Sequence, residues 1–220
     1  MLTCCRNAVI QRFMFLSLLL LSCTSSGGPS ISGEEYLVYS DLFSALPIHR
    51  EDRPLLVIGT ETVGPTMDEV RRAAGCQQDF IAGEPRPPRS SYLLSDEFTP
   101  LVDDLLMNNK QVYTFNRRFN LRRPYLLLRS SDFRGFFNHY GEPGFDRFYK
   151  QYPAADGFKV LSRIGFNSQK TLALVYVESH YTPIDDFTTF LLLRKSDHKW
   201  IRVETYSCDN WRAGIKPDVP

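Results

Sequence analysis

The clearest hydrophobic pattern lies in the last third of the chain. Apolar stretches alternate there with short polar turns, at residues 158–166, 171–177, 187–195 and 200–206. This alternation predicts an antiparallel meander that ends in a hairpin. Residues 172–177 and 190–193 are apolar on both faces, which is typical of central strands covered on both sides. We therefore expect a helix to lie across one face of the sheet.

A short aromatic segment just before the meander is the candidate for that helix. Residues 144–152 carry aromatic side chains on one side of a helix, and Pro153 ends it. The link to the first strand is short, so we expect the helix to fold back with Phe148 against residues 172–177. The aromatic residues are Phe145, Phe148, Tyr149 and Tyr152.

Further helices and strands are predicted upstream. Ser32 and Glu35 have the spacing of a capping box, and Thr66 and Glu69 repeat it. A third helix is expected to begin at Thr99, because proline follows it and an apolar face comes next. The predicted helices cover residues 32–46, 66–74 and 99–108, and the predicted strands cover 55–60, 112–119 and 124–129.

Together these elements predict an α+β fold in which short helices cover an antiparallel sheet. Hydrophobic residues make up 43% of the chain and charged residues 23%, which are the proportions of an ordinary folded protein. A single domain is expected over residues 34–210. The proline-containing stretch near residues 83–91 is a candidate lobe boundary, and residues 211–220 form a C-terminal tail.

The N-terminus has the pattern of a lipoprotein signal peptide. Two arginines precede the apolar run at residues 13–21, which is too short to span a bilayer. Residues 20–23, Leu-Leu-Ser-Cys, resemble a bacterial lipobox, in which cleavage before the cysteine accompanies lipid attachment. We therefore expect a signal peptide at 1–22, lipidation of Cys23 and a polar tether at 23–33. The alternative is an ordinary secretory peptide with a chance cysteine.

Loss of the signal peptide changes the charge and the cysteine content. Arg6 and Arg12 leave with it, so the formal net charge falls from +1 to −1 and gives no reason to expect a nucleic-acid partner. Cys76 and Cys208 remain in the chain in addition to Cys23, and they could form a disulfide in an oxidising envelope. The alternative is two isolated buried thiols.

Two strand motifs resemble a known group of proteins. Residues 161–167, Leu-Ser-Arg-Ile-Gly-Phe-Asn, and 173–177, Ala-Leu-Val-Tyr-Val, are similar to strands of uncharacterised bacterial envelope lipoproteins. The likeness covers residues 34–206 and implies an α+β domain without a known activity. Residues 178–186 depart from the pattern, because the corresponding connection in such proteins is often rich in glycine and contains cysteine.

That same connection holds the sharpest candidates for chemistry. Glu178 and His180 are two residues apart at a strand end, so their side chains should point to one side. With Asp185 and Asp186 across the loop, they are candidate nitrogen and oxygen ligands for a metal ion. The alternative is a solvated polar loop.

Two polar residues lie inside an apolar strand. Ser162, with His139 or His180, is a candidate for a Ser-His-Asp arrangement, although no motif positions these groups. Arg163 needs a carboxylate partner or water, and Glu178 is the partner that we expect.

Arginines and aromatic residues interleave upstream of the meander. In a cytosolic protein this mixture would suggest single-stranded nucleic acid, but export argues against that partner. Anionic lipid headgroups or acidic glycans are what an exported protein meets. The alternative is solvated arginines on strands whose aromatic residues enter the core. The arginines are Arg117, Arg118, Arg122, Arg123, Arg129 and Arg134.

These features predict a lipid-anchored protein of the bacterial cell envelope, held on the membrane through Cys23, whose domain binds or acts as a scaffold without catalysis. An envelope protein or a glycan is the expected partner, and no cofactor is expected. The alternative is an envelope hydrolase or metal-dependent enzyme that uses Glu178, His180 and Asp185.

Overall fold

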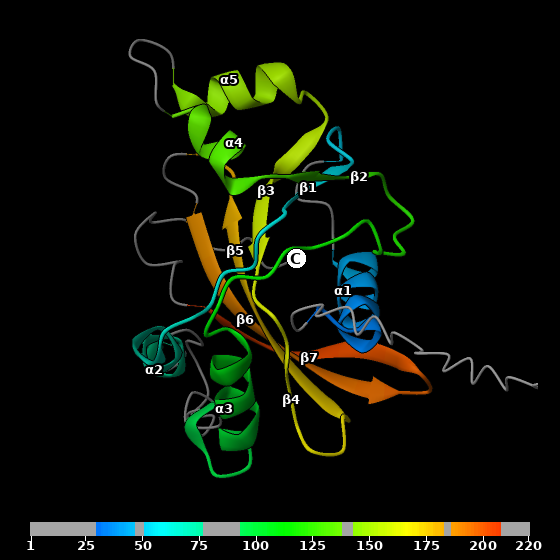
Figure 1. Cartoon of the computed structure of the whole chain (residues 1–220), viewed down its shortest axis with the longest axis vertical. Coiled ribbons are helices and arrows are strands. Elements are labelled where there is room, and N and C mark those ends of the chain that lie inside the picture. The colour runs from blue at the N-terminus through cyan, green and yellow to red at the C-terminus, as the bar shows by residue number, and fades with distance from the viewer. Residues whose placement is uncertain (1–29, 47–50, 77–92, 138–142, 183–185, 208–220) are drawn as a thin grey trace, which may run out of the picture.

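A seven-stranded sheet forms the centre of the protein (Figure 1). The computed structural model describes residues 30–46, 51–76, 93–137, 143–182 and 186–207. The strands are β1 (Leu55–Gly59), β2 (Tyr125–Leu128), β3 (Ala155–Leu161), β4 (Gly165–Phe166), β5 (Leu172–His180), β6 (Asp186–Ser196) and β7 (Lys199–Ser207). The helices are α1 (Gly33–Ala45), α2 (Met67–Cys76), α3 (Thr99–Asn108), α4 (Ser130–Gly135) and α5 (Gly144–Gln151).

The antiparallel meander is present, but it is only part of the sheet. β3, β5, β6 and β7 pair antiparallel in that order, and β4 pairs with β5. β1 pairs in parallel with both β2 and β3, so the sheet is mostly antiparallel but mixed, and the prediction of an antiparallel sheet is confirmed only in part. Parallel pairs need crossover connections, and the chain supplies them with α2 and α3 after β1 and with α4 and α5 after β2.

Both predicted capping boxes form. Ser32 Oγ accepts a hydrogen bond from the Glu35 N–H at 3.2 Å, and Glu35 Oε2 accepts one from the Ser32 N–H at 2.8 Å. Thr66 and Glu69 make the equivalent pair at 3.2 and 2.6 Å. The residue before the first box, Ile31, is already buried. The folded part therefore begins before residue 34, and the predicted tether at 23–33 is too long at its end.

The central strand β5 is covered on both faces, as predicted. Ala173, Val175 and Val177 pack in the cluster that contains α1. Leu174 and Tyr176 point to the opposite face and pack in the cluster of α2 and α3. The period of two along the strand thus sends alternate side chains into two separate cores.

The helix α5, with α4, covers β1 and β3 rather than β5. Phe148 is fully buried in a cluster with Val57, Phe133 and Phe158. Residues 172–177 belong to the other two clusters, so the prediction that Phe148 contacts them is wrong. The sheet continues past β3 to β1 and β2. Helix α5, which directly precedes β3 in the chain, packs on the apolar surface that these strands form.

The predicted strand at 158–166 is divided into β3 and β4. Between them, the Ser162 N–H donates to the Tyr176 carbonyl at 2.9 Å, and Ser162 Oγ accepts from the Tyr176 N–H at 2.9 Å. The Tyr39 hydroxyl of α1 donates to the Ser162 carbonyl at 2.6 Å. The backbone groups at the break are therefore satisfied by one backbone hydrogen bond and by the Ser162 and Tyr39 hydroxyls.

The predicted strand at 112–119 is not a strand. It makes one isolated bridge, between Thr114 and Glu61. Its aromatic residues enter the core instead, and the Phe119 ring centroid lies 5.2 Å from that of Tyr36 on α1. Burial of the aromatic side chains is confirmed for Phe115 and Phe119, whereas Tyr113 is partly buried and the predicted strand is wrong.

The first helix is fastened to the last hairpin. Glu34 Oε1 accepts hydrogen bonds from Lys195 Nζ at 2.8 Å and from Trp200 Nε1 at 3.1 Å. Asp41 Oδ2 accepts from the Trp200 backbone N–H at 2.8 Å. The hydrogen bond from Lys195 holds the pKa of Glu34 below its ordinary value. These contacts join α1, the first of the described elements, to β6 and β7, the last two.

Several predicted segments lie outside the described residues. They are the signal peptide at 1–22, most of the tether, the candidate boundary at 83–91 and the tail at 211–220. Within the described ranges, no helix is long and apolar enough to cross a membrane.

Candidate binding site

The α4–α5 unit is held together by aromatic rings. Phe133 stacks on Phe158 of β3 with ring centroids 3.9 Å apart, and it meets Phe148 edge-on at 5.3 Å. Phe137 meets Phe145 edge-on at 5.1 Å. Edge-on and offset rings contribute beyond the area that they bury. The two short helices are thus fixed to each other and to β3.

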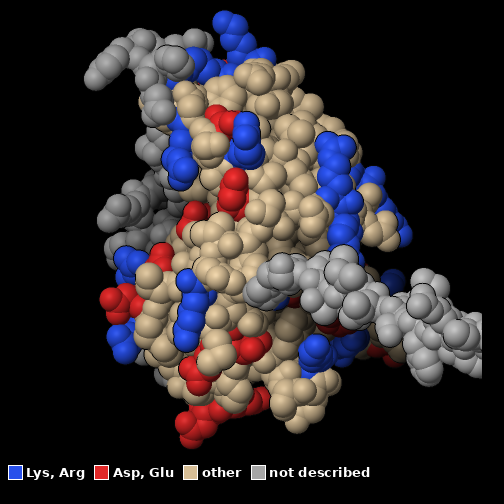
Figure 2. Space-filling view, in the orientation of Figure 1, with Lys and Arg blue, Asp and Glu red and all other residues tan. Residues whose placement is uncertain are grey.

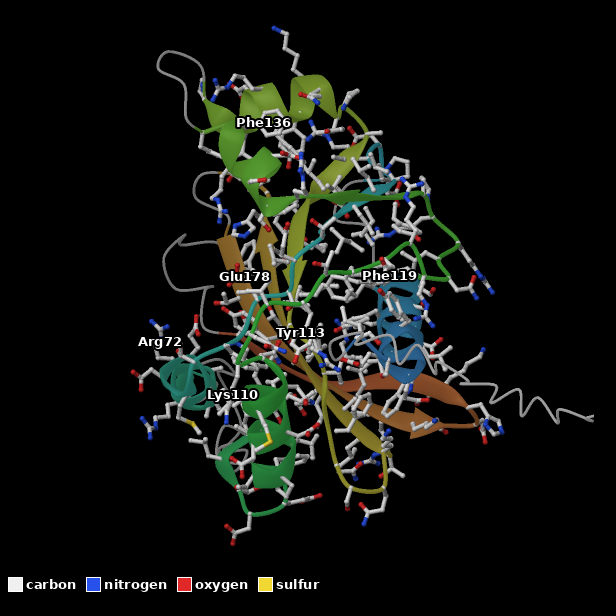
Figure 3. The ribbon with its side chains drawn as sticks, in the orientation of Figure 1. Arg72, Lys110, Tyr113, Phe119, Phe136 and Glu178 are labelled. Atoms are coloured by element: carbon white, nitrogen blue, oxygen red, sulfur yellow. The ribbon has the colours of Figure 1, made fainter. Side chains whose placement is uncertain are left out.

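A cavity of about 680 Å³ lies at this unit, and Phe136, labelled in Figure 3, forms part of its wall. This volume is in the range of small-molecule sites. The wall combines apolar and aromatic surface with a cationic side. Its residues are Leu128, Asp132, Gly135, Phe136, Arg147, Lys150, Gln151 and Tyr152.

Arg147 is the polar group in this wall that lacks acceptors. Its Nε and Nη2 atoms are shielded from solvent and have no hydrogen-bond partner among the described residues. Lys150 adds a second positive charge, whereas Asp132 is already paired with Arg129 at 3.0 Å. A buried donor without an acceptor costs roughly 1–3 kcal/mol. Because Arg147 and Lys150 both line the cavity, its charge suits a ligand that brings carboxylate or phosphate oxygens.

The predicted metal ligands are only partly brought together. Glu178 Oε2 and His180 Nε2 are 3.7 Å apart, so these two side chains do share a side of β5. Asp185 lies outside the described residues, and Asp186 is described only by its backbone, which pairs with His180. In the described ranges, no group of three or more His, Cys, Asp and Glu side chains could hold a metal ion. The four-residue site stays a prediction.

Glu178 is instead one of two carboxylates at a tyrosine. The Tyr176 hydroxyl lies 3.0 Å from Glu69 Oε1 and 3.1 Å from Glu178 Oε1. Burial and the two nearby carboxylates raise the pKa of Tyr176, so its phenol stays protonated. This pairing was not foreseen, because Glu69 lies on α2, far away in sequence. Figure 3 shows Glu178 well apart from Phe136, so this group is separate from the cavity.

Ser162 has a structural role. It is completely buried, and its Oγ is occupied by the Tyr176 N–H. His139 lies outside the described residues. The structure therefore gives no support to Ser162 as a nucleophile.

Arg163 does have a carboxylate partner, but the partner is Glu35 and not Glu178. Arg163 Nε and Nη2 donate to the two Glu35 oxygens at 3.0 and 2.8 Å. Burial alone raises the pKa of Glu35, but hydrogen bonds from Arg163 and Ser32 outweigh it and leave the pKa lowered. The Arg163 guanidinium also lies over the Tyr113 ring, 4.4 Å from its centroid. The pair fixes α1 to the break between β3 and β4.

Lys159 is a buried amine that the sequence prediction missed. It is 6% exposed, and its Nζ donates to the Tyr181 hydroxyl at 2.6 Å and to Ser179 Oγ at 3.2 Å. Asp156 and Arg123 lie nearby as an ion pair at 3.6 Å. Burial lowers the pKa of Lys159 to about 8. The signal in the sequence was a lysine between Phe158 and Val160 in an otherwise apolar strand.

The cysteine predictions lie at or beyond the edges of the described residues. Cys23 and Cys208 are outside them, and the side chain of Cys76, the last residue of α2, is not described. Lipidation of Cys23 and pairing of Cys76 with Cys208 stay predictions.

Comparisons with models of protein families, with curated proteins and with solved structures give no match to this chain. The resemblance to bacterial envelope lipoproteins accordingly stays a prediction from the strand motifs and the lipobox.

Proposed function

We propose that this protein is a lipid-anchored component of the bacterial cell envelope, tethered through Cys23, and that its domain binds a ligand without catalysing a reaction. The lipobox at residues 20–23 supports the anchor. The α4–α5 cavity supports the binding role, because it combines the size of a ligand site with cationic groups.

The ligand class follows from the charge of the cavity wall. Arg147 and Lys150 place two positive charges in the cavity wall, whereas Asp132 is paired with Arg129, so a ligand carboxylate would find cationic partners there. Gln151 and Tyr152, whose side chains are hydrogen-bonded at 3.2 Å, add groups that can bind hydroxyls. A carboxylate beside several hydroxyls is the chemistry of an acidic glycan, which is the ligand that we propose.

The enzyme alternative has one observation in its favour, the Glu178–His180 pair at 3.7 Å. A general base needs a carboxylate or imidazole within reach of a substrate. The His180 ring, however, lies close to the Phe133 and Phe158 rings, with centroids at 5.9 and 6.1 Å. We therefore place binding ahead of catalysis.

The test is a titration of the purified protein with an oligogalacturonate, followed by calorimetry. We expect Arg147→Gln to weaken binding at least tenfold, which corresponds to about 1.4 kcal/mol. Arg134→Gln is the matched control, because Arg134 is an exposed arginine of α4 outside the cavity wall, and it should leave the affinity unchanged.

Circular dichroism of both variants checks that each is folded. The proposal fails if Arg147→Gln binds as tightly as the unaltered protein. It also fails if a neutral maltooligosaccharide of the same length binds equally well, because the carboxylate would then make no contribution.

A further inference from the structure

The chain between residues 116 and 124 forms a basic surface loop, which we call the arginine loop. Arg117, Arg118 and Arg122 are exposed in it, and the segment contains no acidic residue. None of these three arginines forms an ion pair with another described residue. The neighbouring Arg123 is different, because it is largely buried against Asp156. Figure 2 shows Lys and Arg side chains gathered along the edge of the molecule above α1, where this loop runs in Figure 1.

The arginine loop is held on α1 by specific contacts. The Asn116 N–H donates to the Tyr36 hydroxyl at 2.7 Å, and the Asn120 N–H donates to Ser40 Oγ at 2.9 Å. Between them Phe119 is buried against the Tyr36 ring, and Figure 3 shows it beside α1. The charged side chains are therefore presented from a fixed backbone, and their solvent exposure does not arise from a loose loop.

The loop also lies where the N-terminal segment enters the fold. Arg118 Nη2 is 3.9 Å from the position that a Cβ on Gly33 would occupy, at the first residue of α1. The Arg118 guanidinium rests 5.0 Å from the centre of the Tyr36 ring. Cys23 precedes Gly33 by ten residues. Such a segment spans at most about 35 Å when fully extended, and a flexible chain of that length averages about 17 Å.

We propose that the arginine loop docks on the anionic headgroups of the membrane that holds Cys23. This proposal deepens the proposed lipid anchor and rests on it for the identity of the membrane. The field of an anionic bilayer decays over about 10 Å, so the loop must come that close to the surface to use it. A tether of ten residues lets the loop, beside Gly33, reach the surface that holds Cys23. The charge of the loop would suit a bilayer or a free acidic polymer. Its position beside the anchored end favours the bilayer, because only a bilayer is held near that end.

The strength of the interaction can be estimated from the number of charges. Each arginine close to an anionic surface strengthens binding by roughly fivefold, so three arginines supply roughly a hundredfold. Attraction of this kind is screened by salt. The anchor would hold the protein on the membrane, and the loop would set which side of the domain faces it.

The test uses residues 23–220 with Cys23→Ala, which keep every described residue and remove the lipid. Binding is measured by co-sedimentation with vesicles of phosphatidylglycerol and phosphatidylcholine, and with vesicles of phosphatidylcholine alone. We expect binding only to the anionic vesicles, and loss of it in 0.5 M salt. The variant Arg117→Gln/Arg118→Gln/Arg122→Gln should bind roughly a hundredfold more weakly.

Two further proteins keep the test decisive. The control Arg134→Gln/Arg194→Gln/Arg202→Gln removes the same charge from exposed sites elsewhere and should bind like the parent. The milder variant Arg117→Gln/Arg122→Gln leaves the Arg118 contact with Tyr36 and should lose roughly twenty- to thirtyfold. Equal losses in the control, or no binding of the parent to anionic vesicles, would overturn the proposal.

Binding of the parent to oligogalacturonate through the arginine loop, without vesicle binding, would also overturn it and assign the loop to a glycan. These outcomes are independent of the lipid anchor and of the α4–α5 cavity. Failure here would leave lipid labelling of Cys23 and the effect of Arg147→Gln to be judged separately.

Discussion

Lys159 shows how a single residue sets a pH response. Its amine is held by two neutral oxygens, those of Tyr181 and Ser179, and burial is the largest cause of its lowered pKa. The Asp156 carboxylate acts in the opposite direction and Arg123 in the same direction. The folded protein therefore releases this proton near pH 8, whereas an unfolded lysine keeps it to about pH 10.5.

Stability should consequently rise with pH between about 8 and 10.5, because the unfolded state binds one more proton than the folded state. We expect the free energy of unfolding to rise by up to about 1.4 kcal/mol per pH unit in that window. Lys159→Met should remove this rise. Urea unfolding at pH 7 to 9 measures both proteins and stays about one pH unit below the ordinary tyrosine pKa of about 10.

The decisive quantity is the difference in the free energy of unfolding between the parent and Lys159→Met at each pH. Other groups titrate in the same window, but they are common to both proteins and cancel in the difference. Parallel pH profiles for the parent and Lys159→Met would contradict the assignment of the lowered pKa to this amine.

For single residues, the sequence showed which side chain needs a partner, but it did not show which residue the partner is. A carboxylate for Arg163 was correctly required, because an arginine inside an apolar strand must be paired. Glu35 could not be identified, since the break at residues 162–164 that turns Arg163 toward α1 depends on hydrogen bonds to Tyr176 and Tyr39. The cavity had no signal for a similar reason: Arg147 looked like the solvent face of an amphipathic helix.

Among the elements, α5 depends most on one side chain. Phe148 is fully buried, and its ring meets Phe133 of α4 at 5.3 Å, Phe136 just after α4 at 5.7 Å and Tyr149 of its own helix at 5.2 Å. Phe148→Ala should leave a cavity there and lower the free energy of unfolding by about 3–5 kcal/mol. The urea midpoint of the purified variant measures the loss.

Phe137→Ala is the matched control for this substitution. Phe137 belongs to the same unit but is 43% exposed, so its truncation should cost much less. If the two variants have the same midpoint, Phe148 is not the residue that holds α5 on the sheet.

Elements with a strong local pattern were predicted, and those defined by distant partners were not. The meander strands and the capped helices α1 and α2 each carry their signal within a few residues. Segment 112–119 has the composition of a strand, yet Tyr36 of α1 accepts a hydrogen bond from the Asn116 N–H and packs against the Phe119 ring. The parallel pairing of β1 was not predicted, although helices between strands, as predicted around it, are typical of crossover connections.

For the whole molecule, the anchor is the most consequential prediction. Cys23→Ala should abolish metabolic labelling of the protein with a fatty acid and shift it from the membrane fraction to a soluble or uncleaved form, because the acylated thiol is lost. Labelling that survives in Cys23→Ala would end the lipoprotein proposal. Cys76→Ala serves as the control and should keep the label.

The contact between α1 and the last hairpin has a consequence for the timing of folding. Glu34 and Asp41 gain their partners only when Lys195 and Trp200 have been made. The hydrogen bonds that fasten α1 to the last hairpin therefore form only after the last described strand, β7, has been synthesised. Such late completion would suit the export that we propose, because a secretion channel that accepts only unfolded polypeptide needs a chain whose fold has not yet closed.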